Sequence, residues 1–351
     1  MKHKISFCTV CMNRLHHLKQ TLPLNIKNNL SYGNVEFVVM DYSSTDGLSE
    51  WILSEMSEYI QQGVLVYYRY AEADYFDRSH SRNLMFRLAS GTIICNTDAD
   101  NYLGEGFADY ISQQFEKHEN CFLVPDTKRR FYYLRDALGR FCALKQDFMA
   151  IAGYDERMSG YGFEDDDLYE RLIHNGKKEV VIMDLSYLKA IQHKNENRVE
   201  NEFFTNYFHK LFIHFENPEK SNVIVLYKNG MAHKGTLNPN TYNTPAPAVL
   251  LNHKWETALW KKENNKIILD SSETGNVSTF VEQDNYITGN ETIYFNISNQ
   301  NFLQRLSYDL PLITNFGYFL ANKESRKGVN VNGFGKGAVY KNFSTEKTIV
   351  S

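Results

Sequence analysis

Short runs of β-branched and other apolar residues alternate with longer amphipathic stretches over about the first 190 residues. The apolar runs predict strands at residues 5–10, 35–40, 64–70 and 92–95, and a later one at 180–183. The stretches between them predict helices at residues 14–22, 48–62 and 79–89. Because strands and helices alternate, this part of the chain is predicted to be an α/β fold, a mainly parallel sheet flanked by helices.

The pattern changes after about residue 220, where short alternating apolar runs are separated by turn residues. The runs lie at residues 266–269, 279–281, 292–297 and 337–340. They predict a smaller, β-rich C-terminal domain. Three of the seven prolines fall within residues 236–248, which is therefore the expected linker. The expected organisation is a catalytic domain at 1–235, this linker, and an accessory β-rich domain of unknown role at 249–351.

Charge and composition limit the classes of partner. The chain has 38 basic and 42 acidic residues, a net charge of -4, which argues against a dedicated nucleic-acid binder. No apolar run is long enough for a membrane span, although peripheral association stays open. The N-terminus is interpreted as a strand rather than a signal peptide. With an odd count of five cysteines, these features favour a cytoplasmic protein with free thiols. The oligomeric state is not indicated.

Acidic residues follow several of the predicted strands. Asp41, Asp98 and Asp100 all come directly after apolar runs, so we expect them at the carboxyl edge of one sheet, where α/β proteins bind ligands. Two carboxylates spaced as Asp98-Ala-Asp100 can hold one hard divalent cation, which in turn can bridge a diphosphate. Upstream, Arg78 and Arg82 could reach phosphate or orient the acids. A helix face exposed to solvent is the alternative for both arginines.

A second acidic cluster follows a glycine-rich aromatic loop. Residues 160–163 are Gly-Tyr-Gly-Phe, and four acids at 164–167 lead into a helix expected at 168–175. Acids at a helix N-terminus normally cap free N–H groups, but one or two are enough for that. The excess indicates a general base, and a carboxylate at this position is expected to stay ionised near neutral pH. His193, soon after the last strand, could complete a carboxylate-bound cation site, although a lone histidine is more often structural.

In this order the motifs resemble the nucleotide-sugar glycosyltransferases of the GT-A fold. The N-terminal half resembles family 2, through Ser6–Arg14, Asp41-Tyr-Ser-Ser-Thr-Asp-Gly47, Ser81-Arg-Asn83 and Thr97-Asp-Ala-Asp100. The second half is similar to β1,4-galactosyltransferases, through Gly139–Leu144, Gly153-Tyr-Asp155, the segment from Gly160 to Asp167, and His193-Lys-Asn-Glu-Asn197. The resemblance covers about residues 4–200.

The resemblance implies a donor and metal site. Its members bind a UDP-sugar and a metal ion. By resemblance, the donor is bound by Asn13 and Arg14 at the uridine, Asp41 at the uracil or ribose, Asp98 at the ribose or diphosphate, and Arg82. The metal is bound by Asp98, by Asp100 as the main carboxylate ligand of Mn²⁺, and by His193 as a further ligand. Ala190 stands where those enzymes place a methionine ligand. Metal binding is therefore expected to be weaker, or tolerant of Mg²⁺.

The resemblance also implies a glycan acceptor site. Asp165 would be the catalytic base, Glu164 and Asp166 would position the acceptor sugar, and Tyr161 would stack on it. Tyr161 replaces the tryptophan of the galactosyltransferases.

The implied activity is an inverting, metal-dependent transfer of a hexose or N-acetylhexosamine, of galactose or GalNAc type, in surface polysaccharide or glycoconjugate synthesis. A non-catalytic nucleotide-sugar or glycan-binding protein, a sugar-nucleotide pyrophosphorylase and a retaining transferase are the alternatives.

Overall fold

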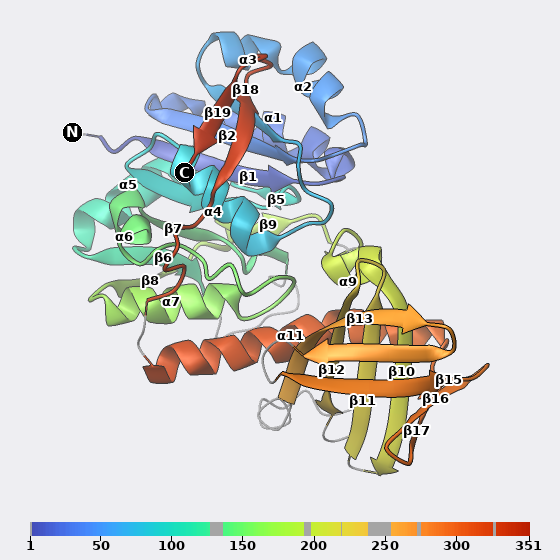
Figure 1. Ribbon diagram of the computed structural model, residues 1–351. Helices are drawn as coiled ribbons and strands as arrows, with labels where there is room; N and C mark the ends of the chain where they lie inside the picture. Colours follow the sequence, from blue (N-terminus) through green and yellow to red (C-terminus); the bar gives the residue numbers. More distant parts are fainter. Residues whose placement is uncertain are drawn as a thin grey trace. The chain divides into compact units, whose positions relative to one another are not determined.

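A computed structural model describes residues 2–126, 136–192, 198–218, 220–237, 254–271, 275–325 and 328–351. The chain divides into two compact units (Figure 1). The first comprises Met1–Ser159, Phe163–Asn201 and Ala321–Ser351, and the second comprises Gly160–Gly162 and Glu202–Leu320. Among the described residues, no helix combines the length and the apolar character needed to cross a bilayer.

The first unit contains a nine-stranded sheet in the order β19-β18-β3-β2-β1-β4-β7-β6-β8. Its strands are β1 (Ile5–Cys11), β2 (Val35–Tyr42), β3 (Leu65–Tyr70), β4 (Ile93–Asn96), β6 (Cys121–Pro125), β7 (Phe141–Leu144), β8 (Lys178–Ile182), β18 (Gly337–Lys341) and β19 (Lys347–Val350). The central strands β3, β2, β1 and β4 are parallel, as β6 and β8 are, whereas β7 runs antiparallel between β4 and β6. The predicted α/β class is confirmed.

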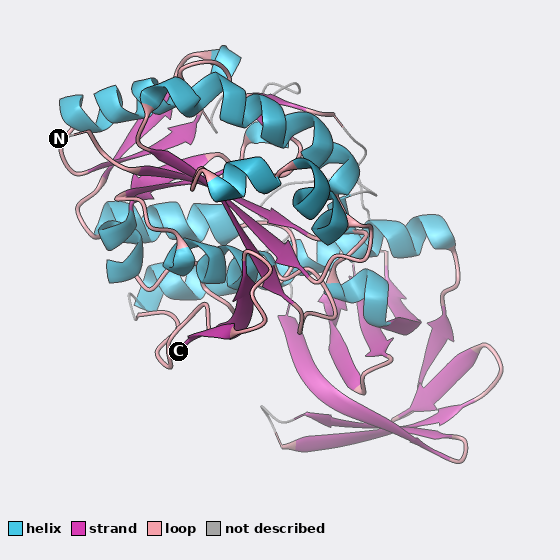
Figure 2. Ribbon diagram, turned by 90° about the horizontal axis from the view of Figure 1, so that it is seen from above, coloured by secondary structure: helices cyan, strands magenta, loops and turns pink. Residues whose placement is uncertain are grey.

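Helices cover both faces of this sheet (Figure 2). The helices are α1 (Leu15–Asn29), α2 (Leu48–Glu55), α3 (Ser57–Gln61), α4 (Arg78–Leu88), α5 (Phe107–Lys117), α6 (Lys145–Ala150) and α7 (Glu164–His174), with short 3₁₀ turns at Leu30–Tyr32 and Leu185–Tyr187 and a small strand pair β5 (Asn101–Tyr102) and β9 (Lys189–Ala190). Alternate residues of β2 enter two separate cores: Phe37 packs with residues of α1, α2 and α5, and Val38 packs with residues of α4, α6 and α7. Burial on both faces explains why these strands are almost continuously apolar.

The C-terminal residues return to the first unit. Strand β18 pairs antiparallel with β3, which Figure 1 shows as red beside blue. Asn342 accepts a hydrogen bond from the backbone of Tyr67, 275 positions earlier, at 2.8 Å. The strand predicted at 337–340 therefore exists but belongs to the sheet of the first unit. A local alternation of side chains predicts a strand and says nothing about its partner.

The second unit is a closed antiparallel barrel of eight strands. Its strands are β10 (Phe208–Asn217), β11 (Lys220–Tyr227), β12 (Met231–Leu237), β13 (Lys254–Glu263), β14 (Lys266–Ser271), β15 (Asn276–Glu282), β16 (Tyr286–Gly289) and β17 (Thr292–Asn296). Phe212, Ile224 and Phe280 lie in its interior core. The other face of β10 and β11 packs with α9 (Phe203–Tyr207) and with apolar residues of α11 (Gln300–Ser325).

The barrel begins earlier in the sequence than expected. Strands β10 and β11 precede the expected boundary at residue 235, and β12 crosses it and pairs with β13 beyond it. Residues 236 and 237 end β12, and the rest of the expected linker lies outside the described residues. Helix α11 was not expected in a β-rich region. It is amphipathic enough to bury Leu306 and Leu310, although Pro311 lies inside it.

Candidate active site

The sheet of the first unit has a topological switch point between β1 and β4. Strand β1 pairs in parallel with β2 on one side and with β4 on the other, so the loops that follow all three strands leave the same edge. In α/β sheets ligands bind at such points, outside the carboxyl ends of the strands. Asn13 and Arg14 follow β1, Asp41 lies near the end of β2, and Asp98 and Asp100 follow β4.

Asp41 organises the turn after β2. It has no exposed surface, and its carboxylate accepts hydrogen bonds from the backbone N–H of Ser44 at 2.8 Å and the hydroxyl of Tyr67 at 2.7 Å. Burial raises its pKa. In the same turn, Asn13 Oδ1 accepts a hydrogen bond from the backbone of Thr45 at 2.8 Å. Asp41 thus faces the protein interior, and a direct contact with a ligand stays a prediction.

Arg14 directly precedes α1 and lies beside Glu200. Its Nη1 is 3.0 Å from a carboxylate oxygen of Glu200. Asn13, directly before it, has a φ of 55° and therefore adopts the left-handed conformation that asparagine tolerates. The turn places both residues after the carboxyl end of β1, and their role at the uridine stays a prediction.

Asp98 is partly open to solvent and is held by two donors. Its side chain is 36% exposed, and its Oδ1 lies 3.1 Å from Asn96 Nδ2 and 3.4 Å from Arg82 Nη2. Burial alone would raise the pKa of Asp98, but the positive charges of Arg82 and Arg78 lower it below its usual range. Asp98 is therefore ionised at neutral pH.

Asp100 is held by residues that the sequence did not single out for this role. Its Oδ1 accepts a hydrogen bond of 2.7 Å from Asn101 Nδ2. Asn101 is itself fixed by Arg140, whose guanidinium donates to Asn101 Oδ1 at 3.0 Å and to the carbonyl of Tyr187 at 2.9 Å. Arg140 is fully buried. Its position after Gly139, within a quoted motif, is the signal that could have identified it.

The four consecutive acids form the first turn of α7. The helix begins at Glu164, not near 168 as expected, because the acids themselves supply its N-terminal turn. Asp167 is buried, and its carboxylate accepts hydrogen bonds from Arg171 and Asn322. Glu164 is also buried. Asp166 is exposed, whereas the Asp165 side chain is 24% exposed. Partial exposure allows a substrate hydroxyl to reach Asp165.

One buried arginine connects the two acidic clusters. Arg82, on α4, is 4% exposed. Its Nη1 lies 3.2 Å from Asp165 Oδ1 and 3.6 Å from Glu164 Oε1, and its Nη2 contacts Asp98. Burial would lower the pKa of Arg82, but these carboxylates raise it, so the guanidinium stays charged. The structure therefore brings Asp98 of the D-x-D loop and Asp165 of α7 to opposite sides of a single cation.

Asp98 and Asp165, which both contact Arg82, have different pKa values. Burial raises the pKa of Asp165 to about 7; the charge of Arg82 opposes this shift, and the negative charges of Glu164, Asp98 and Asp166 add to it. The expectation that Asp165 would be ionised throughout the neutral range is therefore wrong, because burial outweighs the helix N-terminus. Environments that separate the pKa values of neighbouring acids are typical of catalytic pairs.

The remaining predicted residues are placed as follows. Tyr161 belongs to the second unit, where its ring centroid lies 5.0 Å from that of Tyr308. His193 lies outside the described residues. Within the described ranges, no group of three His, Cys, Asp or Glu side chains is arranged to hold a metal ion. Asp98 and Asp100 nevertheless offer hard oxygen ligands, which fit Mn²⁺ or Mg²⁺ in donor type.

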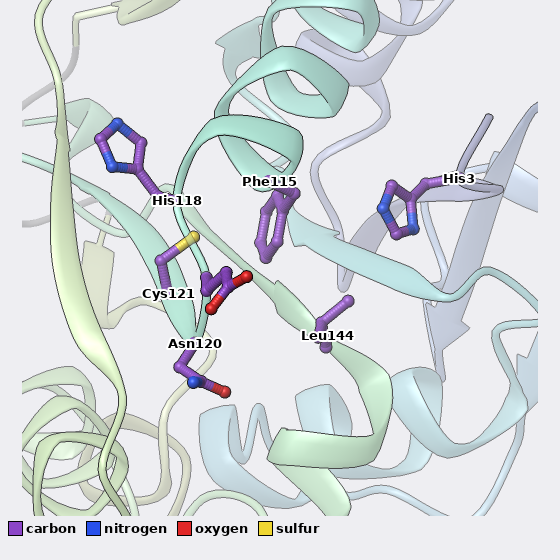
Figure 3. Close-up of a pocket in the computed structure, with 7 residues that line it drawn as sticks. His3, Phe115, His118, Asn120, Cys121 and Leu144 are labelled. Carbon is purple, nitrogen blue, oxygen red and sulfur yellow. The ribbon is translucent and has the colours of Figure 1, made fainter. Parts of the chain in front are cut away.

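A cavity of about 280 Å³ lies at the opposite edge of the sheet (Figure 3). It is lined by His3, before β1, by Cys121, at the start of β6, and by other residues such as Phe115 and His118. None of the acids described above lines it. The candidate active site is thus separate from this cavity.

Two family models match overlapping segments of the chain. The model of glycosyl transferase family 2 matches residues 6–140, and the model described as the N-terminal domain of galactosyltransferase matches residues 127–194. Together the two matches cover residues 6–194, and both are to models of sugar-transferring enzymes. The resemblance of each half is confirmed. The Gly-Tyr-Gly-Phe-Glu-Asp-Asp-Asp motif is not itself tested by these matches.

Solved structures of glycosyltransferases are similar to part of this chain. A mannosyltransferase from Pyrobaculum calidifontis, in complex with GDP-Man and Mn²⁺, is 17% identical, with a TM-score of 0.46. The match covers 57% of this chain and 62% of that one, less than two thirds. S. aureus TarS 1-349 in complex with UDP-GlcNAc is 14% identical, with a TM-score of 0.44, and the match covers 57% of this chain and 67% of that one. The catalytic domain of Drosophila β1,4-galactosyltransferase 7 in complex with xylobiose is 15% identical, with a TM-score of 0.39, and the match covers 57% of this chain and 75% of that one. No curated protein sequence matches.

Proposed function

We propose that the protein is an inverting, metal-dependent glycosyltransferase that moves a hexose or N-acetylhexosamine from a UDP-sugar to a hydroxyl of a glycan. The observation that carries this proposal is the Arg82 cluster, in which one buried guanidinium joins Asp98 to Asp165. Asp98, on the donor side, and Asp165, the proposed base, contact different nitrogens of the same guanidinium. This arrangement suits an in-line displacement between two substrates.

The proposed reaction is a single displacement. Asp165 takes the proton of the acceptor hydroxyl as the oxygen attacks the anomeric carbon of the donor. The bond from that carbon to the diphosphate oxygen breaks, and UDP departs with the electron pair. Because attack and departure occur on opposite faces, an α-linked donor gives a β-linked product. A divalent cation held by Asp98 and Asp100 would neutralise charge on the departing diphosphate.

The substrate assignments rest on sequence similarity. The match of residues 127–194 to a galactosyltransferase model supports a galactose or GalNAc donor. Glu164 and Asp166 flank the proposed base and would bind acceptor hydroxyls, with Tyr161 stacking on the sugar. All five cysteines are free and buried, which supports a reducing compartment and a cytoplasmic role in surface-glycan assembly.

The test is UDP release from a panel of UDP-sugars in the presence of an oligosaccharide acceptor mixture, with Mn²⁺, Mg²⁺ or EDTA. We expect release from one donor with Mn²⁺, and no release with EDTA or with Asp100→Ala. Product stereochemistry by NMR should show inversion. Calorimetric UDP binding without release from any donor would instead favour a binding protein, and the absence of both would refute nucleotide-sugar use.

The pKa of Asp165 predicts the acid side of the pH profile. Because the base must be ionised, kcat/KM should fall about tenfold for each pH unit below about 7. UDP affinity, measured at each pH, serves as the control for loss of donor binding. A flat profile from about pH 5 to pH 8 would contradict Asp165 as the base.

A further inference from the structure

Tyr154 supports the proposed base from inside the protein. It is fully buried, and its hydroxyl donates a hydrogen bond of 3.1 Å to Asp165 Oδ1. The Arg82 guanidinium lies over its ring, 5.4 Å from the centroid. Burial, and then the charge of Asp165, raise the pKa of Tyr154, so the hydroxyl keeps its proton and acts as a donor. Asp165 Oδ1 therefore receives two donors, one charged and one neutral.

The backbone of Tyr154 is fixed by two asparagines far apart in the sequence. Its N–H donates to Asn83 Oδ1 at 2.8 Å, and its carbonyl accepts from Asn83 Nδ2 at 2.9 Å and from Asn330 Nδ2 at 2.6 Å. Gly153 has a φ of 64°, and a Cβ there would lie 2.4 Å from Asn83 Oδ1. This close approach admits only glycine, so the position of the Tyr154 ring is tightly determined.

The ring is enclosed as firmly as the backbone. Phe148 packs edge-on at 5.9 Å between centroids, and Phe86 lies at 6.3 Å. Both aromatic residues are fully buried in the same core. The hydroxyl therefore points at Asp165 from a side chain that has no room to change rotamer.

We propose that Tyr154 is a positioning residue that orients the Asp165 carboxylate toward the acceptor and stabilises its ionised form, with Asn330 of the C-terminal segment completing its support. This rests on the proposed function, in which Asp165 is the base. It adds a residue of the catalytic domain that lies beyond the matched segment 6–194, since Asn330 comes after the barrel.

The electrostatic balance around Asp165 explains why a neutral donor matters. The carboxylate faces one positive group, Arg82, and three negative ones, Glu164, Asp98 and Asp166. Arg82 is shared among Asp98, Glu164 and Asp165, so its positive charge does not fully balance the negative charge of Asp165. A hydrogen bond donated to the charged form of an acid favours that form. Loss of the Tyr154 hydroxyl should therefore make Asp165 harder to ionise.

The experiment compares Tyr154→Phe with wild type in the transferase assay across pH. We expect kcat to fall about tenfold, the effect of losing a hydrogen bond to a charged group, with both KM values unchanged. We also expect the acid limb of the profile to move to higher pH. Tyr169→Phe is the matched control, because its buried hydroxyl has no hydrogen-bond partner among the described residues. A Tyr154→Phe profile that superimposes on wild type would overturn the proposal.

A second measurement needs no enzymatic activity. Thermal unfolding of Tyr154→Phe, Asp165→Ala and the double variant forms a cycle that isolates the coupling of the two side chains, because alanine offers no acceptor to the Tyr154 hydroxyl. We expect a coupling at about pH 8, where Asp165 is ionised, that shrinks at about pH 5. Additive effects at both pH values would refute the hydrogen bond. If wild type releases no UDP, the proposed function fails, and this cycle still decides the contact.

A separate variant tests the hydrogen bond from Asn330 to the Tyr154 carbonyl. Asn330→Ala removes the bond to the Tyr154 carbonyl and leaves the ring and hydroxyl in place. We expect the same direction of change as in Tyr154→Phe, with a smaller shift of the acid limb. An unchanged kcat and pH profile would exclude the C-terminal segment from this role, and it would do so even if Tyr154→Phe failed to fold.

Discussion

Asp165→Asn should lower kcat by about 10²–10⁴-fold, the range over which general-base catalysis contributes, while UDP binding persists. The amide keeps the size of the side chain and its contact with Arg82, but it cannot accept the acceptor proton. Single-turnover transfer and calorimetric UDP binding are the measurements. Transfer at a rate close to wild type would show that another group is the base.

The same substitution should stabilise the fold at high pH. The folded-state pKa of Asp165, about 7, lies above that of an unfolded chain, about 3.9. The folded protein therefore holds a proton that the unfolded chain has released, and wild-type stability falls as pH rises through this window. Asparagine has no such loss. Thermal unfolding should show the variant more stable than wild type at about pH 8 and not at about pH 4.

The control for Asp165→Asn is Glu170→Gln on the same helix. Glu170 is exposed and pairs only loosely with Lys323, at 3.3 Å. An exposed pair of this kind contributes little to stability. Glu170→Gln should leave transfer and the pH dependence of unfolding unchanged, which would separate the role of Asp165 from any general effect of removing an acid from α7.

Arg82→Met should be the most destabilising change at the site, by about 3–5 kcal/mol at neutral pH, the loss typical of a buried ion pair deprived of one partner. Asp98, Glu164 and Asp165 would then face one another without a cation. The loss should shrink toward about pH 5, where protonation neutralises Asp165. Chemical unfolding at two pH values measures it, and transfer should be lost at both.

Lys347→Met provides the comparison for an exposed ion pair. Lys347 and Glu72 are 3.2 Å apart, and both side chains are largely in solvent. Screening by water leaves such pairs with little effect. If Arg82→Met were no more destabilising than Lys347→Met, the arginine would not be holding the acids together, and the Arg82 cluster could not support the proposed function.

The N-terminal half of the fold was predictable because its signals are local. The strands found at Ile5–Cys11 and Ile93–Asn96 coincide within two residues with the apolar runs at 5–10 and 92–95. Asp98 and Asp100 follow such a run, so parallel topology alone places them at the binding edge. Glycosyltransferase character followed from the order of several short motifs, each weak alone, and the two family models confirm it.

Other features depend on contacts that no local pattern contains. The burial of Arg82 could not be predicted from the polar residues next to it in the sequence. It depends on Asp98 and Asp165, which lie 16 and 83 positions away. Asn330 lies in a turn whose sequence gives no indication that it meets Tyr154, 176 positions earlier. The titration of Asp165 near neutral pH follows from burial, which a run of four acids does not suggest.

The barrel is an insertion within the sequence of the catalytic domain. Residues 1–159 and 163–201 lie before its main segment, and residues 321–351 lie after it. A nascent chain therefore synthesises the whole barrel before β18 exists to pair with β3, or Asn330 to bond Tyr154. The edge of β3 stays open during that interval, and closing it requires contacts across 275 positions. The catalytic sheet is thus expected to finish folding after the barrel, although most of its strands are synthesised first.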